Sequence, residues 1–401
     1  ASGTVDGAGN VTAADFLNTL ATVTLSGTKT WADNGDLFGR RPGDITLTIL
    51  ADGVAITPSS SIQWNTGTNP WTYTISDLPR YRKGTTTAIA YTVRESAAPA
   101  YTAASATVSG TVDGSSGNIT GAAFTNTLDV VSVSGQKTWV DENDRYGTRP
   151  DALALTLLAD GEPLDPQPMP AWDKSDPAVW TYTFNGVPRY QSDNTTAIVY
   201  TVQEAAATGY ATSAGTTVGG TMDASGNVTD ANLTNELITV SITGTKTWMD
   251  DGDRYGARPD GLALTVLADE IVLAPQPSIS WIKAGDAWAY TIDGLPRYQA
   301  GTLTAVRYAV RETLPAGYAA VGETTVTGTV DADTGNVTEA DFTNTLVTVS
   351  IRGAKAWVDN GDRYGKRPSV LPLTVLADGV AMSVQPELAW TKGADSWAYV
   401  A

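Results

Sequence analysis

The sequence predicts an all-β protein made of tandem β-sandwiches. A pentapeptide of the form Gly-x-Lys-x-Trp occurs four times and places Lys29, Lys137, Lys246 and Lys355 at equivalent positions. Its period of roughly 109 residues is the size of one β-sandwich domain. Thr, Val, Gly, Tyr and Trp are abundant, and no stretch of useful length has a helical period of apolar residues. A chain of 401 residues therefore suits several such domains in a row.

The repeat boundaries follow from self-alignment of the sequence. Residues 1–20 match residues 109–128 almost position for position, so the sequence opens with the tail of a repeat whose beginning is missing. Three full repeats are expected at 21–128, 129–237 and 238–346, and residues 347–401 copy the front half of a further repeat. We expect this sequence to be a window from a longer array.

The first full repeat shows its strand signals in order. We expect strands at residues 23–31, 45–51, 71–75, 88–95, 107–112 and 123–128. The first two are separated by a polar loop with Asp33 and Asp36, closed by Arg41-Pro42, and a hairpin turn is expected at 113–118. Only a few residues separate one repeat from the next. The sequence therefore predicts repeats stacked end to end as a fairly stiff rod.

Composition excludes several functional classes. The formal net charge of −18 argues against nucleic acid or an anionic membrane as a partner and fits a secreted surface protein. The sequence has no cysteine and no histidine, which removes disulfides, thiolate metal sites, histidine-ligated zinc and the Ser-His-Asp triad. No apolar run is long enough to cross a membrane, and no signal peptide is visible. We expect no membrane insertion, no cofactor and no metal.

The lysine of the pentapeptide needs a physical explanation. In a strand, a lysine two residues before a tryptophan points to the same face, which here is the expected core. Burying an unpaired ammonium group costs several kcal/mol. Two other polar side chains share inward faces with apolar residues in each full repeat: a glutamate after Tyr-x-Val-x, and an asparagine in the closing strand. These are Glu95 and Asn126, Glu204 and Asn235, and Glu312 and Asn344.

Lysine, asparagine and a carboxyl group buried together can form an intramolecular amide, or isopeptide, bond. Burial favours the neutral forms of both the amine and the acid. The amine can then attack the side-chain carbonyl of asparagine, while the acid polarises that carbonyl and shuttles the proton as ammonia leaves. The fold supplies the proximity that the reaction requires. The amide product is neutral, which removes the cost of the buried charge.

The order of the recurring motifs resembles the B-type repeats of Gram-positive collagen adhesins and pilins, the Cna-B-like domains. The motifs are G-x-K-x-W-x-D, R-P, L-x-A-D-G, W-x-Y, L-P-R-Y, Y-T-V-x-E and T-N-T-L. The resemblance implies an immunoglobulin-like, transthyretin-like sandwich with a self-formed Lys–Asn bond between its first and last strands, promoted by Glu. The sequence departs from the motifs at Asp269-Glu270 and at Glu236, away from the reactive atoms.

The same resemblance assigns the site residues. The implied bonds are Lys29–Asn126 with Glu95, Lys137–Asn235 with Glu204, and Lys246–Asn344 with Glu312. Asn18 and Lys355 lack partners within their own partial repeats, so we expect both to be unpaired. The resemblance therefore implies a single-turnover self-cross-linking and no enzymatic turnover.

Simpler interpretations accompany several of these features. The Lys/Glu/Asn set could be a buried salt bridge with no covalent bond. The Asp-x-x-Asp loops could bind calcium, although loops that cap their own backbone are favoured; they contain Asp33 and Asp36, Asp141 and Asp144, Asp250 and Asp253, and Asp359 and Asp362. The Asn-x-Thr sequences at Asn10, Asn118, Asn227 and Asn336 fit turn chemistry better than glycosylation. The recurring tryptophans are expected in the core rather than in a glycan-binding platform.

The resulting functional hypothesis is the stalk of a bacterial cell-surface adhesin or fibril, extracellular and attached to a Gram-positive cell wall. One alternative is an adhesin module that itself binds a host matrix protein or glycan; the sequence does not identify such a ligand. Another alternative is a filament subunit, in which residues 347–401 of one copy are completed by residues 1–20 of the next by strand complementation.

Overall fold

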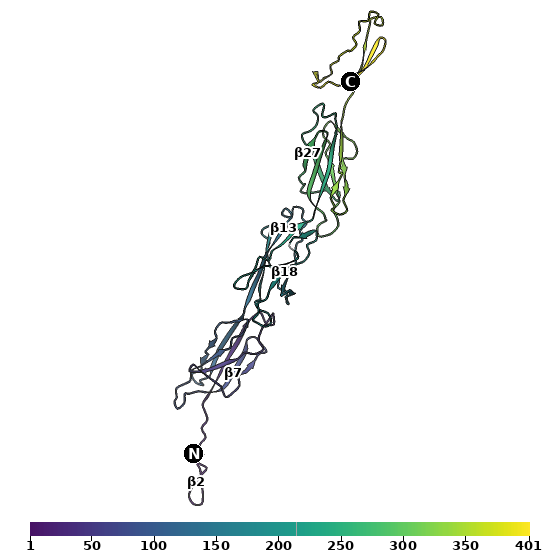
Figure 1. Ribbon diagram of the computed structural model, residues 1–401. Coiled ribbons are helices and arrows are strands. Elements are labelled where there is room, and N and C mark those ends of the chain that lie inside the picture. The colour runs from purple at the N-terminus through teal and green to yellow at the C-terminus, as the bar shows by residue number, and fades with distance from the viewer. Residues whose placement is uncertain (214) are drawn as a thin grey trace. The chain divides into compact units, whose positions relative to one another are not determined.

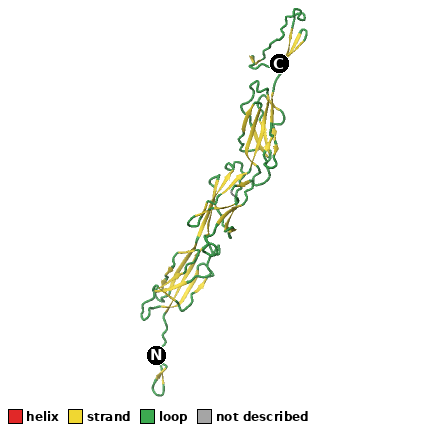
Figure 2. Ribbon diagram, viewed as in Figure 1, coloured by secondary structure: helices red, strands yellow, loops and turns green. Residues whose placement is uncertain are grey.

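A computed structural model describes residues 1–213 and 215–401. Within these residues the structure consists of strands and loops, with no helix, as Figure 2 shows. It therefore has no helix that is long and apolar enough to span a membrane in the described residues. The chain forms two compact units, one comprising residues 1–139, 153–206 and 212–234, and the other residues 140–152, 207–211 and 235–401. The predicted all-β class is confirmed.

The first full repeat contains ten strands, which belong to two sheets (Figure 1). They are β3 (Thr22–Ala32), β4 (Leu47–Ala51), β5 (Val54–Ile56), β6 (Gln63–Asn65), β7 (Trp71–Pro79), β8 (Tyr91–Glu95), β9 (Tyr101–Ala103), β10 (Thr107–Val108), β11 (Thr111–Val112) and β12 (Ile119–Leu128). One sheet has the order β11-β12-β3-β7-β6, with β9 paired to β12, and the other has the order β10-β8-β4-β5.

The first and last strands of this repeat, β3 and β12, are parallel neighbours. Their register aligns Phe124 with Lys29 and Asn126 with Trp31. This pairing brings together residues that are almost a whole repeat apart in sequence. It is the arrangement that a bond between the first and last strands requires.

The core of the first repeat lies between its two sheets. Buried side chains come from both sheets, among them Leu25 of β3, Ile49 of β4 and Val93 of β8. Along β3 every second residue is buried, and Lys29 falls in the buried phase. The two-residue period of a strand therefore places the lysine in the core between Gly27 and Trp31.

The structure differs from the sequence prediction at residues 107–112, where we expected one strand. The chain forms two short strands, of which β10 pairs with β8 in one sheet and β11 pairs with β12 in the other. Between them is Gly110, where a Cβ atom would lie 2.4 Å from the carbonyl oxygen of Thr120. The segment crosses from one sheet to the other at this close approach. Periodicity alone cannot reveal such a crossing, because both halves are extended.

The second repeat follows the same plan. Its strands are β13 (Val130–Val140), β14 (Leu155–Ala159), β15 (Glu162–Pro163), β16 (Ala171–Asp173), β17 (Val179–Pro188), β18 (Tyr200–Glu204), β19 (Tyr210–Thr212), β20 (Thr217–Gly219), β21 (Thr221–Met222), β22 (Val228–Thr229) and β23 (Leu233–Leu237). One sheet contains the path β16-β17-β13-β22-β21, and the other has the order β15-β14-β18-β20.

The third repeat lies wholly within the second compact unit. Its strands are β24 (Thr239–Met249), β25 (Leu264–Ala268), β26 (Ile271–Val272), β27 (Ser280–Ala284), β28 (Ala287–Pro296), β29 (Tyr308–Glu312), β30 (Tyr318–Ala320), β31 (Thr325–Val326), β32 (Thr329–Val330), β33 (Val337–Thr338) and β34 (Phe342–Leu346). The first and last strands are again parallel neighbours, with Asn344 of β34 aligned to Trp248 of β24.

The two partial repeats contain fewer strands. Residues 1–20 form an exposed hairpin of β1 (Thr4–Val5) and β2 (Val11–Thr12). Residues 347–401 form the sheet β35-β39-β38 and the separate pair β36-β37. The bounds are β35 (Arg352–Ala356), β36 (Leu376–Ala377), β37 (Val380–Ala381), β38 (Ala389–Lys392) and β39 (Ser396–Val400).

Candidate functional site: a buried lysine, glutamate and asparagine

The lysine of the first repeat is enclosed in the core. Lys29 has no exposed surface, and its Nζ lies 4.4 Å from the centre of the Trp31 ring. Trp31 in turn packs edge-to-face against Trp71 and Tyr101, with ring centres 5.3 and 4.8 Å away. The amine thus lies against the Trp31 ring, which belongs to a cluster of three aromatic side chains and can stabilise positive charge on the amine.

Glu95 reaches the lysine from the opposite sheet. Its Oε1 lies 2.8 Å from Lys29 Nζ, and the carboxyl side chain is only 2% exposed. The amine and the carboxyl group therefore form a close, buried contact between the two sheets.

Asn126 completes the set on β12. It is almost fully buried, and its Nδ2 donates a hydrogen bond of 2.9 Å to Glu95 Oε1. The same carboxyl oxygen therefore contacts both the lysine amine and the asparagine amide. Asn126 Oδ1 has no hydrogen-bond partner in the described part of the chain.

This contact differs in one detail from the chemistry expected from the sequence. We expected the acid to polarise the asparagine carbonyl, whereas Glu95 contacts the amide nitrogen. In this contact the glutamate oxygen is the acceptor, and the amide N–H group of Asn126 is the donor.

The third repeat has the same arrangement. Lys246 has no exposed surface, and its Nζ lies 2.9 Å from Oε1 of Glu312. Asn344 Nδ2 donates to that same oxygen at 2.6 Å. Two repeats therefore bring their lysine, glutamate and asparagine together in the same way.

The second repeat contains the same lysine–glutamate pair. Lys137 Nζ lies 2.9 Å from Glu204 Oε2, and neither side chain is exposed. Asn235, at the centre of β23, is also fully buried, and neither polar atom of its amide has a hydrogen-bond partner among the described residues. Its pairing with Lys137 remains a prediction.

Burial changes the acid–base properties of the three lysines. Removal from water lowers the pKa of Lys29, Lys137 and Lys246 from the ordinary value of 10.5, and the neighbouring glutamate opposes this effect without cancelling it. A lower pKa increases the neutral fraction of the amine, which is the nucleophilic form.

The glycine of the pentapeptide leaves room for a tyrosine that bonds to the last strand. The hydroxyl of Tyr73 passes over Gly27 and donates a 2.7 Å hydrogen bond to the carbonyl of Ala122 on β12. A Cβ atom at Gly27 would lie 1.8 Å from that carbonyl oxygen and 2.5 Å from the tyrosine hydroxyl. Only glycine therefore lets β3, β12 and the tyrosine approach so closely. Sequence reasoning missed this function, although the spacing of the glycine and the W-x-Y tyrosine recurs.

The Asp-rich loop covers the aromatic end of the site. Arg41 binds both carboxyl oxygens of Asp33 at 2.6 Å, and the hydroxyl of Tyr101 donates to Asp33 at 3.1 Å. Asp36 accepts hydrogen bonds from the backbone N–H groups of Arg40 and Arg41. The loop thus caps its own backbone, as expected, and a calcium ion at Asp33 would have to displace Arg41.

The asparagine of one Asn-x-Thr sequence in each full repeat ties the hairpin turn to the first strand. Asn118 Oδ1 accepts from the N–H group of Thr24 at 2.8 Å, Asn227 Oδ1 from that of Ser132 at 3.0 Å, and Asn336 Oδ1 from that of Ser241 at 2.9 Å. These contacts agree with the turn interpretation of the motif.

The partial repeats do not enclose their site residues. Asn18 is exposed, and so is Lys355, whose Nζ lies 5.5 Å from the centre of the Trp357 ring. No carboxylate lies at ion-pair distance from Lys355 in the described part of the chain.

These features define a protein of tandem immunoglobulin-like β-sandwiches, each with a lysine–glutamate pair buried in an aromatic core. The model of the Cna protein B-type domain matches residues 25–120, 133–230 and 242–339, each inside one of the three expected full repeats. The chain therefore belongs to the Cna protein B-type domain family.

The chain is also similar to several known proteins. The chain is 29% identical over 368 residues to a collagen adhesin of Staphylococcus aureus, covering 90% of this chain and 27% of that protein. Among solved structures, two B repeat units of the Staphylococcus aureus collagen-binding protein are 25% identical, with 81% of this chain and 75% of that chain covered and a TM-score of 0.27. The major pilin from Streptococcus pyogenes is 13% identical, with 55% and 99% covered and a TM-score of 0.28.

Proposed function

We propose that this chain is part of the stalk of a bacterial cell-surface adhesin, and that its repeats are stabilised by Lys–Asn isopeptide bonds that they form themselves. The proposed bonds are Lys29–Asn126, Lys137–Asn235 and Lys246–Asn344, within repeats at 21–128, 129–237 and 238–346. The promoting residues are Glu95, Glu204 and Glu312. Asn18 and Lys355 are proposed to stay unbonded within this chain.

One observation supports the proposal most strongly. Oε1 of Glu95 contacts both Lys29 Nζ and Asn126 Nδ2 inside a core without water access, and Glu312 does the same for Lys246 and Asn344. A single oxygen atom between the attacking nitrogen and the departing nitrogen is well placed to transfer a proton from one to the other.

The proposed reaction is balanced without any cofactor. The neutral amine of the lysine attacks Cγ of the asparagine, so that the Nζ–Cγ bond forms and the Cγ–Nδ2 bond breaks. The glutamate accepts a proton from the amine and delivers it to Nδ2, which leaves as ammonia. The glutamate is regenerated, and the lysine and asparagine remain as one neutral secondary amide. Proximity in the folded core replaces the high concentration that such an unreactive amide would otherwise need.

The position of the bond fits a mechanical task. Lys29 is near the end of β3 and Asn126 is near the end of β12, and these strands are parallel neighbours. A pulling force that enters at the start of β3 and leaves at the end of β12 would pass through the bond. The residues between Lys29 and Asn126 would carry none of that force.

The cellular setting of this proposal rests on the relatives. The collagen adhesin of Staphylococcus aureus is matched over only 27% of its length, so its binding activity belongs to that protein as a whole. What this chain shares with it is the repeated B-type domain. We therefore propose an extracellular, cell-wall-attached location in a Gram-positive bacterium and a supporting role.

Intact-mass spectrometry of the folded, purified chain tests the proposal. The expected mass is lower than the sequence mass by one ammonia for each bond, which is three in total. Peptide mapping should then recover the three cross-linked peptide pairs, and Lys355 should be found as a free lysine. An unshifted mass would leave only the salt-bridge interpretation.

A further inference from the structure

The loop after the first strand of the third repeat carries an arginine–tyrosine pair that contacts the next segment of the chain. Arg254 Nη1 forms an ion pair of 3.1 Å with Asp251, and its guanidinium group lies 5.7 Å from the centre of the Tyr255 ring. Arg254 Nη2 donates a 3.1 Å hydrogen bond to the main-chain carbonyl of Gln385, 131 residues further along.

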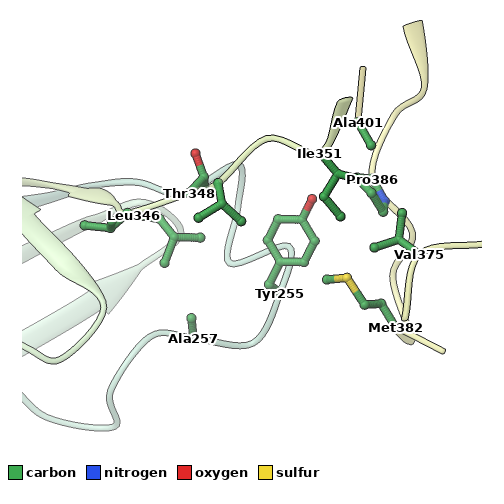
Figure 3. Close-up of a pocket in the computed structure, with 11 residues that line it drawn as sticks. Tyr255, Ala257, Leu346, Thr348, Ile351, Val375, Met382, Pro386 and Ala401 are labelled. Atoms are coloured by element: carbon green, nitrogen blue, oxygen red, sulfur yellow. The ribbon is translucent and has the colours of Figure 1, made fainter. Parts of the chain in front are cut away.

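Tyr255 adds an apolar contact beside this hydrogen bond. Its ring lines a cavity of about 280 Å³ whose other walls include Ile351, Val375, Met382 and Pro386 of the segment 347–401 (Figure 3). Tyr255 is 38% exposed, so more than half of its surface is covered. Arginine and tyrosine are both common anchor residues of interfaces. Here the arginine supplies the polar contact and the tyrosine ring the apolar one.

The side chain of Gln385 fixes the conformation of the segment that the arginine–tyrosine pair contacts. Its side-chain Oε1 accepts from the N–H group of Val375 at 2.7 Å, and its Nε2 donates to the carbonyls of Val375 at 3.2 Å and of Met382 at 2.7 Å. All of these contacts lie within the receiving segment. They hold the Gln385-Pro386 dipeptide in place and leave its main-chain carbonyl available to Arg254.

The same contact occurs a second time within the same compact unit. Arg145 Nη2 donates a 2.8 Å hydrogen bond to the main-chain carbonyl of Gln276, again 131 residues away. Tyr146 packs against the core of the third repeat, and burial raises its pKa. Gln276 is held through Val266 and Leu273 in the way that Gln385 is held through Val375 and Met382.

A third copy of the pair supplies an internal comparison. Arg363 and Tyr364 stack in the same manner, at 5.7 Å, but Tyr364 is 76% exposed. The tyrosine is therefore not buried by its own loop. It is covered where a Gln-Pro segment of a following repeat lies against it.

We propose that this Arg–Tyr pair is a docking element that recognises the Gln-Pro segment of the following B-type repeat. The arginine donates a hydrogen bond to the main-chain carbonyl of the glutamine, and the tyrosine ring faces the apolar side chains beside the proline. The partner is the next repeat of the same chain: residues 238–346 for Arg145 and Tyr146, and residues 347–401 for Arg254 and Tyr255. This docking is independent of the isopeptide bonds.

The first repeat has a different version of the element. Leu37 and Phe38 replace the pair, and Phe38 packs against the core of the second repeat without an arginine–carbonyl bond from position 37. At this junction the position of the tyrosine is therefore taken by an apolar ring, and the position of the arginine by a leucine. We expect the two arginine-containing junctions to be more restricted in orientation than this one.

Distance measurements between spin labels on the full chain test the proposal. Because the sequence contains no cysteine, Ala300→Cys and Glu387→Cys provide two specific labelling sites, one on the third repeat and one on the segment 347–401. The parent chain should give a narrow distance distribution. Replacing Arg254 and Tyr255 together by alanine should broaden it by about twofold, because the segment loses its anchor. Gln385→Ala, which alters only the receiving side, should broaden it to a similar extent.

Two matched variants control for indirect effects. Tyr255→Phe keeps the ring and should leave the distribution narrow, and so should alanine at both Arg363 and Tyr364, the exposed copy of the pair. Hydrogen exchange of β25 and β29 should be unchanged in all variants, which shows that the third repeat stays folded. A broad distribution in the parent chain overturns the proposal. So does a narrow one in either docking variant, or equal broadening in the Arg363 and Tyr364 variant.

Discussion

The amide nitrogen of Asn126 donates a 2.9 Å hydrogen bond to Oε1 of Glu95, an atom on the opposite sheet of the sandwich. The same oxygen lies 2.8 Å from the amine of Lys29. Glu95 therefore contacts both the proposed nucleophile and the nitrogen that the proposed reaction would expel. This relationship leads to the following predictions.

Glu312→Gln should prevent the bond in the third repeat only. Glutamine has nearly the same shape as glutamate but cannot accept a proton from the amine and pass it on. The mass of the variant should therefore fall short of the sequence mass by two ammonia molecules instead of three. Glu323→Gln, at an exposed position of the same repeat, should retain all three losses.

Asn126→Ala should destabilise the first repeat strongly. The bond would close a loop of nearly one hundred residues, and by analogy with a disulfide its removal should cost about 4–5 kcal/mol of unfolding free energy. Chemical denaturation followed by hydrogen exchange of β7 would measure the loss. If the first repeat of this variant is as stable as in the parent chain, no covalent bond is present there.

Without its bond, the third repeat should become more stable as the pH rises. In Asn344→Ala the amine of Lys246 stays free, and burial holds its pKa in the folded state below the ordinary value of 10.5, with Glu312 opposing this shift. Between those two pKa values the unfolded chain binds more protons, so the free energy of unfolding rises with pH and levels off above about 10.5.

The matched control for this pH dependence replaces Lys246 by methionine in the same Asn344→Ala background. Groups that do not contact Lys246 titrate equally in both variants, so the difference between their stability curves reports on Lys246 and its contact with Glu312. The expected difference is a rise in the alkaline range, measured by denaturation at a series of pH values. A flat difference curve would contradict the lowered pKa.

Gly27→Ala should disrupt the pairing of β3 with β12. The added methyl group would lie 1.8 Å from the carbonyl oxygen of Ala122, so the strands would have to separate. A cost of at least about 3 kcal/mol is expected, together with loss of the first repeat's bond, seen as one ammonia fewer in the mass difference. Gly43→Ala is the control, since a Cβ there meets no atom within 4 Å.

The loop anchored by Asp250 should weaken in acid. Hydrogen bonds from Arg258 hold the pKa of Asp250 at about 2, below the ordinary 3.8, against the opposing effect of burial. A carboxyl group with a depressed pKa stabilises the fold above 3.8, and this contribution is lost as the pH falls toward about 2. Asp250→Asn should therefore be less stable at neutral pH and lack this acid-dependent loss. Asp293→Asn, at an exposed position, should behave like the parent chain.

Much of the fold could be predicted from the sequence because the alternation of buried and exposed residues recurs in each repeat. The alternation of β3 places Lys29 inward, and the same alternation applies to Glu95 and Asn126. Short strands such as β5, β6 and β9 were not expected, since three residues carry too little periodic signal. The split at Gly110 was also not expected, because both halves of the segment are extended and periodicity does not show where it changes sheets.

The two motifs of the docking element recur in the sequence, but the sequence does not show that they contact each other. Asp-Arg-Tyr-Gly occurs at 144–147, 253–256 and 362–365, and Gln-Pro occurs at 167–168, 276–277 and 385–386. Nothing in either motif says that Arg254 should bind the carbonyl of Gln385, because a contact across 131 residues depends on how neighbouring repeats meet.

The sequence by itself determined the number of repeats, the all-β class and the identity of the three inward polar residues, since these follow from period and alternation along single strands. Only the tertiary structure decided that β3 and β12 lie side by side, and that Glu95 meets the amide nitrogen of Asn126 and not its carbonyl. Periodicity fixes which face a side chain occupies. The contact between two faces is fixed by sheet order and register, which depend on residues far apart in the chain.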